Sequence, residues 1–435
     1  MRQFLIIFLI ISSLSAAAQG TLSFRSLNEV FAYADAHSVT FKNATQQVLM
    51  NKYQTLAAKL DKWKIKGDAN LTSTDNTKLG VTFIPAEIFG GPTGTYRQVT
   101  FGQQYVTAAT FAPQIDILNP FAMAQVRTAR ASEQVTNATN LLNKKSLYES
   151  VAAAYYNILS YQWQIRVTKN SLDNADTLTT IMVNKQQEGI ARQQDVNNAK
   201  ANQLSIQDKL QQLEVNLEEQ YSSLKLLCDM DPNIPIHIEE TIAPANFDAS
   251  LTATGYLTQL QSEWQMKYQE ADLRANKRWF MPTVTLFSSL GWQQNTNNHP
   301  FDGSRWINSN YVGVKLIIPI FPDVGKVAAV RYDRINLAVA KNNFEHAARQ
   351  DSVNNQQLQL EYQKAFKSAR LAGEIAALKE DSYYKNLNIY KEGILSATDL
   401  FTAFNDWLNN SLNAVSQQAS SDYAKSKIMI NNIVK

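Results

Sequence analysis

Long stretches of the chain alternate apolar and polar residues with the period of an amphipathic helix. Four polar segments, nearly free of proline, show this pattern: 26–62, 120–227, 248–278 and 324–433. In the second segment apolar side chains recur every three or four residues, at Ile206, Leu210, Leu213, Leu217, Tyr221, Leu224 and Cys228. This spacing predicts helices that pack against other helices. Taken alone, it also fits a coiled coil or a helical bundle with no further function.

Two stretches between these helices, 63–119 and 279–322, change to the period of a β-strand. Four segments carry the new pattern, two in each stretch: 68–74, 98–111, 283–292 and 311–321. They are rich in Thr, Val, Phe and Tyr and alternate along the chain, which predicts strands. Loops rich in Gly, Asn and Pro, around 90–92 and 295–303, join the two strands of each pair. The predicted order is helix, hairpin and long helix, followed by the same three elements again.

The second half of the chain repeats the first at a constant offset of 204 residues. Three landmarks share this offset: Glu188-Gly189-Ile190 recurs as Glu392-Gly393-Ile394, Asp195 as Asp399, and the Val-Arg-x-x-Arg segment 126–130 as 330–334. A shared register over distant landmarks indicates a duplication. The predicted organisation is a first repeat at 19–228, a linker at 229–247 and a second repeat at 248–435. The hairpins lie at about 63–119 and 279–322, and Gly189 and Gly393 mark the tips of the two helical hairpins.

The N-terminus has the features of a secretory signal peptide. Arg2 supplies a positive charge, a short apolar run follows, and Ala16-Ala17-Ala18 offers a cleavage site, so residues 1–18 are the predicted signal. The alternative is a buried N-terminal helix. Cys228 is the only cysteine, so an intrachain disulfide is excluded, and an exported protein of this size without one suits a bacterial envelope.

The mature segment contains no apolar run of about twenty residues, so only strands could cross a membrane. The predicted strands have about the ten residues that a tilted membrane strand needs. Aromatic residues on or beside them form a candidate girdle at the membrane interface: Trp279, Trp292, Trp306 and Tyr311. The alternative is the aromatic core of a soluble hairpin domain. Membrane strands must close into a barrel of about eight or more, so four per chain require several chains, and three would supply twelve.

With these features the chain resembles the TolC-like outer-membrane efflux proteins, also called outer membrane factors. The matching residues are Gly189 with Asp195, Gly393 with Asp399, and the strand end Ile318-Pro-Ile-Phe-Pro-Asp-Val-Gly-Lys before a helix. The resemblance covers essentially the whole mature chain. It implies a homotrimer with a 12-stranded β-barrel in outer-membrane lipid, continued by an α-helical barrel in the periplasm. It also implies a passive exit duct that is opened by a periplasmic adaptor (membrane fusion) protein and an inner-membrane pump of the RND, ABC or MFS type.

The resemblance further implies two functional regions at the helical tips. Adaptor docking corresponds to Glu188, Gly189, Ile190, Glu392, Gly393 and Ile394, with Glu in place of an apolar residue. A periplasmic gate corresponds to Asp399, with Thr402 where some members have a second acidic residue. Asp195 belongs to the same gate, and Leu395 replaces the basic residue with which the family's aspartate pairs. Arg192 is near enough in sequence to be a substitute partner for either Asp195 or Asp399. A ring of three Asp399 carboxylates would favour cations. The other interpretation is that Asp195 and Asp399 cap the returning helices.

The sequence carries no recognisable catalytic or cofactor motif. Its four histidines are scattered without an H-E-x-x-H motif, which gives no support to a zinc site. Gly325-Lys326 lacks the rest of a phosphate loop, and there is no G-x-S-x-G elbow. The formal charge of +3 gives no support to nucleic-acid binding. The prediction is a non-enzyme without metal or cofactor. Two alternatives remain: a periplasmic or secreted helical-bundle structural protein, and an envelope enzyme whose site has no recognisable motif.

Overall fold

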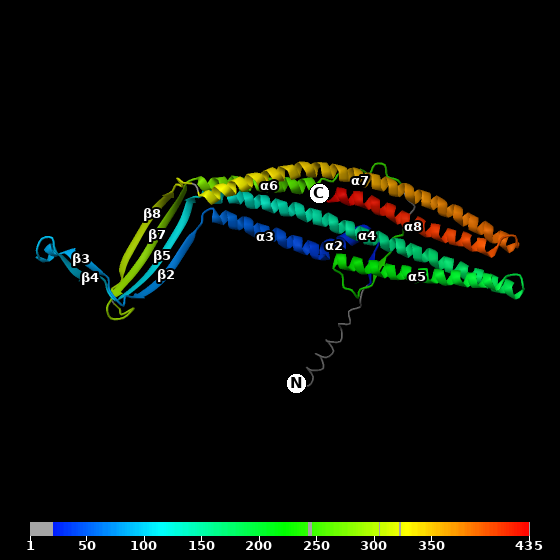
Figure 1. The fold of residues 1–435 in the computed structure, drawn as a ribbon, viewed down its shortest axis with the longest axis horizontal. Helices are drawn as coiled ribbons and strands as arrows, with labels where there is room; N and C mark the ends of the chain where they lie inside the picture. Colours follow the sequence, from blue (N-terminus) through cyan, green and yellow to red (C-terminus); the bar gives the residue numbers. More distant parts are fainter. Residues whose placement is uncertain (1–20, 242–245, 304, 322, 435) are drawn as a thin grey trace, which may run out of the picture. The chain divides into compact units, whose positions relative to one another are not determined.

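The computed structural model describes residues 21–434 except 242–245, 304 and 322. The predicted signal peptide at 1–18 therefore lies outside the described residues. The chain is mainly helical with a smaller strand portion, as the sequence predicts (Figure 1). It divides into a helical unit, made of the residues up to 47, 137–261 and those from 345 onward, and a sheet unit of 48–136 and 262–344. Within the described ranges, no helix combines the length and the apolar character that crossing a bilayer requires.

A four-stranded antiparallel sheet in the order β2-β5-β7-β8 forms the centre of the sheet unit. Its strands are β2 (Lys66–Asp75), β5 (Tyr105–Leu118), β7 (Thr283–Thr296) and β8 (Ile307–Ile317). At one end of the sheet each strand adjoins a helix in the sequence. β2 follows α3 (Val39–Asp61), and β7 follows α6 (Leu257–Lys277) and the short turn η2 (Arg278–Phe280). β5 precedes α4 (Pro120–Gln187), and β8 precedes α7 (Val324–Lys391). At the opposite end, the described residues form loops and one further hairpin. We call this end the loop end.

This further hairpin lies between β2 and β5 and is not visible in the sequence pattern. β3 (Val81–Pro85) pairs with β4 (Tyr96–Thr100), and the 3-10 turn η1 (Ala86–Phe89) begins its tip. The predicted strand 98–111 is therefore wrong, because two separate strands share it. The chain turns at Gly102, whose φ of +113° is open to glycine and strained for other residues. The alternation of residue types continues across this turn, so the sequence pattern does not reveal that two strands meet there.

Both repeats cap the change from strand to long helix in the same way. Asn119 Oδ1 accepts the N–H of Ala122 at 3.0 Å, and Asp323 Oδ1 accepts the N–H of Gly325 at 2.8 Å. These oxygens satisfy N–H groups that have no preceding helical turn to bond. The two helices that follow, α4 and α7, contain 68 residues each and begin 204 residues apart. That distance equals the offset between the sequence landmarks.

The helical unit contains α2 (Leu27–His37), α5 (Gln193–Cys228), α8 (Ala397–Ile433) and most of α4 and α7. Two short strands, β1 (Leu22–Phe24) and β6 (Ile236–Ile238), pair in parallel. Two predicted helices differ from the observed ones. The segment 26–62 is two helices, because Ser38 leaves the helical region with a ψ of 136°. The segment 248–278 becomes helical only at Leu257. Before it, the Asp248 carboxylate accepts the N–H and hydroxyl of Ser250 in a local turn, and the N–H of Thr254 donates to Asn432 Oδ1 of α8 instead of to a preceding carbonyl.

One core of the helical unit packs α2, α4 and α5 against the β1–β6 pair. Val30, Val151 and Ile158 are fully buried in it. Tyr155 is also buried, and its hydroxyl donates a hydrogen bond to Glu240. Cys228 closes the apolar seam of α5, as predicted, and burial raises the pKa of its thiol to about 12. This thiol is therefore protonated and unreactive near neutral pH.

Candidate functional site

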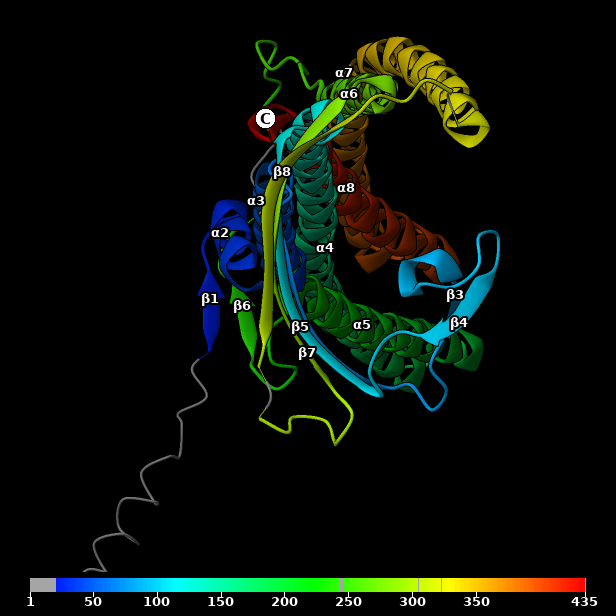
Figure 2. The ribbon, with the colours of Figure 1, turned by 90° about the vertical axis from the view of Figure 1, so that its left-hand side faces the viewer.

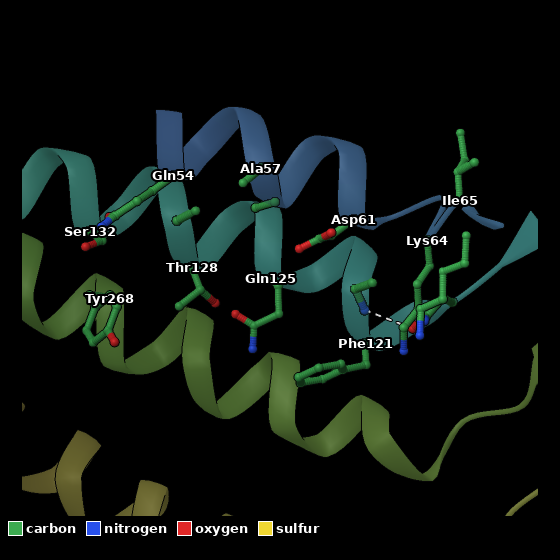
Figure 3. A pocket seen from close by; sticks show the side chains of 15 residues that line it. Gln54, Ala57, Asp61, Lys64, Ile65, Phe121, Gln125, Thr128, Ser132 and Tyr268 are labelled. Atoms are coloured by element: carbon green, nitrogen blue, oxygen red, sulfur yellow. Dashed lines mark hydrogen bonds between the residues drawn. The ribbon is translucent and has the colours of Figure 1, made fainter. Parts of the chain in front are cut away.

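A hollow of about 650 Å³ lies between α3, α4 and α6 of the sheet unit (Figure 3). Ala57, Asp61, Gln125 and Thr128 line it together with Tyr268, and Lys64 lies at one end. Its mixture of alanine, amide and hydroxyl side chains is that of a gap between packed helices. Across the described part of the chain, no group of three or more His, Cys, Asp or Glu side chains is arranged to hold a metal ion.

The pairing register gives the four-stranded sheet one apolar and one polar face. Residues opposite each other on neighbouring strands share a face, and successive residues of a strand alternate between faces. The apolar face carries chiefly Ala69, Leu71, Ala109, Phe111, Ile115, Val284, Leu286, Leu290, Trp292, Val312, Val314 and Leu316. Near the loop end the same face carries the polar residues Ser73, Asp75, Thr107, Gln294, Thr296, Asn308 and Asn310. The polar face carries chiefly Asp68, Asn70, Thr72, Thr110, Gln114, Asp116, Thr285, Ser289, Gln293, Ser309 and Lys315. On all four strands the apolar residues of this apolar face lie toward the helices, so the separation of the two faces is clearest in that part of the sheet.

The apolar face is open to its surroundings in the single chain. Val312, Val314 and Leu316 keep 72%, 64% and 58% of their surface exposed. Burying one such side chain contributes about 2 kcal/mol, so leaving the whole face in water would be strongly unfavourable. On the polar face, side chains form hydrogen bonds with one another. The Asp116 carboxylate accepts one from the Thr285 hydroxyl at 2.7 Å and one from the Asn119 side-chain amide at 2.9 Å. The sheet is suited to separate an apolar medium from water.

The four residues of the predicted aromatic girdle do not share one surface. Trp292 lies on the apolar face of β7, and Trp306 precedes β8 beside Phe301. Trp279 lies in η2, with its ring 5.2 Å from that of Phe121. Tyr311 pairs with Ser289 and packs edge-on against Phe287, 6.1 Å away, on the polar face. Tyr311 and Trp292 therefore lie on opposite faces of the sheet, and a composition-based assignment could not detect this because the face depends on the register.

Both lateral edges of the sheet are open. β2 and β8 each pair with one strand only among the described residues. The helices next to these edges expose apolar side chains spaced three or four residues apart. We call these the α3 seam, made of Leu49, Tyr53, Leu56 and Leu60, and the α7 seam, made of Tyr332, Ile335 and Val339. This spacing is that of a helix face packed against another helix. The sequence shows the spacing but not that the seams are left uncovered within one chain.

The first predicted tip is a tight turn between α4 and α5. Gly189 has a φ of +76°, and the N–H groups of Ile190 and Ala191 both donate to Lys185 O, at 2.8 and 3.1 Å. These bonds close the end of α4 in the manner of a glycine C-cap. Glu188, Gly189 and Ile190 are exposed, so the residues predicted to dock an adaptor lie on the surface.

The second predicted tip joins α7 to α8 with the same geometry. Gly393 has a φ of +81°, the N–H of Ile394 donates to Ile389 O at 3.2 Å, and Glu392 is exposed. Figure 1 shows the two turns at the same end of the helical unit. Each turn needs a positive φ, which accounts for the recurrence of glycine at the repeat offset.

Two of the predicted gate residues, Asp195 and Asp399, take part in the caps of the helices that return from the tips. Asp195 accepts the main-chain N–H of Arg192 at 3.1 Å, and no ion pair joins these two side chains within the described ranges. Asp399 accepts the Ser396 hydroxyl at 2.6 Å, and Ser396 Oγ accepts the N–H of Asp399 at 3.1 Å. The Thr402 hydroxyl donates to Thr398 O. Asp399 and Thr402 are exposed, so capping leaves their side chains accessible.

A second core, which we call the tip core, joins the helical hairpins of the two repeats. It contains Leu178 and Met182 of α4 and an aromatic group from α7 and α8. In that group the rings of Tyr383 and Trp407 stack 5.1 Å apart, and Phe404 lies against both. The spacing of Phe401, Phe404 and Trp407 is a sequence signal that could have revealed this core.

No protein-family model matches the chain, and no curated protein sequence matches it. Its structure is similar to solved outer-membrane channels over almost its full length. The outer membrane protein VceC from Vibrio cholerae is 17% identical, with a TM-score of 0.68 over 93% of this chain and 95% of that chain. The CmeC channel of Campylobacter jejuni is 17% identical, with a TM-score of 0.67 over 93% of this chain and 85% of that chain. The open state of the MtrE channel of Neisseria gonorrhoeae is 13% identical, with a TM-score of 0.71 over 93% of this chain and 88% of that chain. The single-chain part of the expected fold, mainly helical with a smaller strand portion, is thereby confirmed.

Proposed function

We propose, from the fold that this chain shares with the TolC-like outer-membrane channels, that three copies form the outer-membrane exit duct of a tripartite efflux or secretion system. One observation carries the proposal: a four-stranded sheet with an apolar face, a polar face and two open edges. In this arrangement the apolar face contacts outer-membrane lipid, and the polar face lines a water-filled passage.

The open edges are the argument for several copies. Lipid offers no hydrogen-bond partner, so β8 of one copy must pair with β2 of the next until the ring closes. Three copies supply twelve strands, which at about 4.8 Å spacing and about 40° tilt enclose a barrel of about 12 Å radius. The α3 and α7 seams border the same two edges, so the contact that pairs the strands would also bury both seams.

The helical unit then continues the duct into the periplasm. We assign the gate to Asp399, Thr402, Asp195 and Arg192, with three Asp399 carboxylates meeting at the constriction. A periplasmic adaptor would dock at the exposed tips, where Glu188 and Glu392 each add a carboxylate per chain. The duct itself is passive, and an inner-membrane pump of the RND, ABC or MFS type supplies the energy.

The test is the assembly and conductance of the full-length purified protein. In detergent we expect the mass of a trimer, and in a planar lipid bilayer we expect discrete conductance steps. A monomer in aqueous extracts without conductance would contradict the channel and favour the alternative of a helical-bundle structural protein. A variant at a strand edge links the trimer mass to the conductance. Asn310→Pro removes an N–H from the edge strand β8, so it should reduce both the amount of trimer and the conductance.

A further inference from the structure

The β3–β4 hairpin occurs once per chain although the fold is duplicated. Residues 76–104 separate β2 from β5 in the first repeat, whereas residues 297–306 separate β7 from β8 in the second. The longer connection contains the hairpin, and the described part of the shorter one contains no strand. A ring of three copies therefore has three such hairpins at its loop end.

The base of the hairpin lies over the polar face of the sheet. Lys78, Leu79 and Phe101 line a hollow of about 630 Å³ whose other wall includes Gln293 and Asn295 of β7. Both β7 residues belong to the polar face by their register. Figure 2 shows the hairpin turned to one side of the sheet instead of extending it in line. The N–H of Asn76 donates to Gln104 O at 2.7 Å and holds the two chain segments at this base together.

One side of the hairpin is apolar and uncovered. Val81, Phe83 and Tyr96 share this side by register with Gln98 and Thr100, and 65% of Phe83 and 69% of Tyr96 remain exposed. At the tip, 70% of Ile88 is exposed as well. An isolated two-stranded hairpin is marginally stable in water. A cover for this side would both stabilise the hairpin and remove its aromatic side chains from water.

The position of the hairpin indicates which molecule covers it. If the polar face lines the duct, as the proposed function requires, a hairpin over that face projects toward the threefold axis. A five-residue strand reaches about 17 Å, more than the barrel radius of about 12 Å. The corresponding hairpins of the other two copies reach the same axis. We propose that the three β3–β4 hairpins pack their apolar sides together across the axis and form an outer gate at the loop end of the duct.

Cross-linking of single cysteines tests the contact. Cys228 is buried, so an introduced cysteine is the reactive thiol. In the full-length trimer, a short bis-maleimide should link F83C chains into dimers. The matched control is T82C, the next residue on the same strand, whose side chain lies on the opposite side of the hairpin. Equal cross-linking of both variants, no cross-linking of F83C, or quenching of a probe at F83C by spin-labelled lipid would overturn the proposal.

Accessibility from outside the cell tests the gate. Ser289 lies on the polar face, seven residues before the end of β7 at Thr296. A membrane-impermeant maleimide should label S289C slowly in intact cells, and roughly tenfold faster when a Gly-Ser turn replaces residues 81–100. Equal rates in a protein that still forms a conducting trimer would overturn the gate and leave the proposed duct intact. A wild-type protein with neither trimer nor conductance would instead remove the proposed function, and the gate with it.

Discussion

The Tyr390 hydroxyl donates a hydrogen bond to Met182 Sδ at 2.9 Å and thereby joins α7 of the second repeat to α4 of the first. Lys185 supports the same contact, with its Nζ 4.2 Å from the centre of the Tyr390 ring and 3.4 Å from Tyr390 O. All three residues lie within about two turns of Gly189 or Gly393. The positions of the two tips are therefore coupled through side chains of both repeats.

Truncating this contact should destabilise the helical unit. Tyr390→Ala removes a buried ring and is expected to cost about 3 to 4 kcal/mol, whereas Tyr390→Phe removes only the hydroxyl and should cost about 1 kcal/mol or less. Thermal unfolding followed by circular dichroism measures both. Glu380→Ala, at an exposed position of the same helix, is the control and should shift the midpoint little. Equal midpoints for Tyr390→Ala and Glu380→Ala would show that the contact does not hold the repeats together.

The charge of Asp399 can be separated from its capping role. Asp399→Ala removes both the carboxylate and its bond to Ser396, whereas Ser396→Ala removes the cap and leaves the charge. Both should cost about 1 kcal/mol of helix stability. Only Asp399→Ala should raise single-channel conductance or weaken block by divalent cations, because only it removes the ring of charge. Identical conductance and block in the two variants would assign Asp399 to capping alone.

Asp422 should make stability depend on pH. Burial raises the pKa of its carboxyl, the Gln418 amide and Lys425 partly offset this, and Glu240 adds to it. A raised pKa means that the folded state favours the protonated form. This contribution is fully present below the unfolded pKa of about 3.9 and is lost as the pH rises through the raised value.

Asp422→Asn keeps the side chain neutral at every pH. The variant should therefore unfold at a higher temperature than the wild type at pH 7, and this difference should shrink as the pH falls toward about 4. Thermal midpoints measured across this pH range test the prediction. A difference that stays constant, or that grows toward low pH, would contradict it.

Sequence reasoning succeeded where the signal is local and failed where it depends on pairing. The spacing of residue types along the chain predicts the glycine turns at Gly189 and Gly393 and the apolar seam that ends at Cys228. The same spacing does not predict the turn at Gly102 between β4 and β5, because the alternation of apolar and polar residues resumes immediately after it. The face of Tyr311 is decided by its pairing with Ser289, which lies on another strand.

The gate residues show a second limit of sequence patterns. Spacing suggested Arg192 as the partner of Asp195, and the two residues do interact, but through the main-chain N–H of Arg192. A pattern of residue types cannot distinguish a side-chain ion pair from a helix cap. The open seams of α3 and α7 are a similar case, since their spacing is visible but their lack of cover within one chain requires the fold.

The orientation of β8 in the membrane tests the proposed duct most directly. Single cysteines at 309, 311, 312, 314, 315 and 316, each carrying a small fluorescent probe, would be reconstituted in bilayers with a lipid-attached quencher. Quenching should be strong at Val312, Val314 and Leu316 and weak at Ser309, Tyr311 and Lys315, because these sets lie on opposite faces. Uniform quenching along the strand, or uniform protection from it, would contradict a sheet that separates lipid from water.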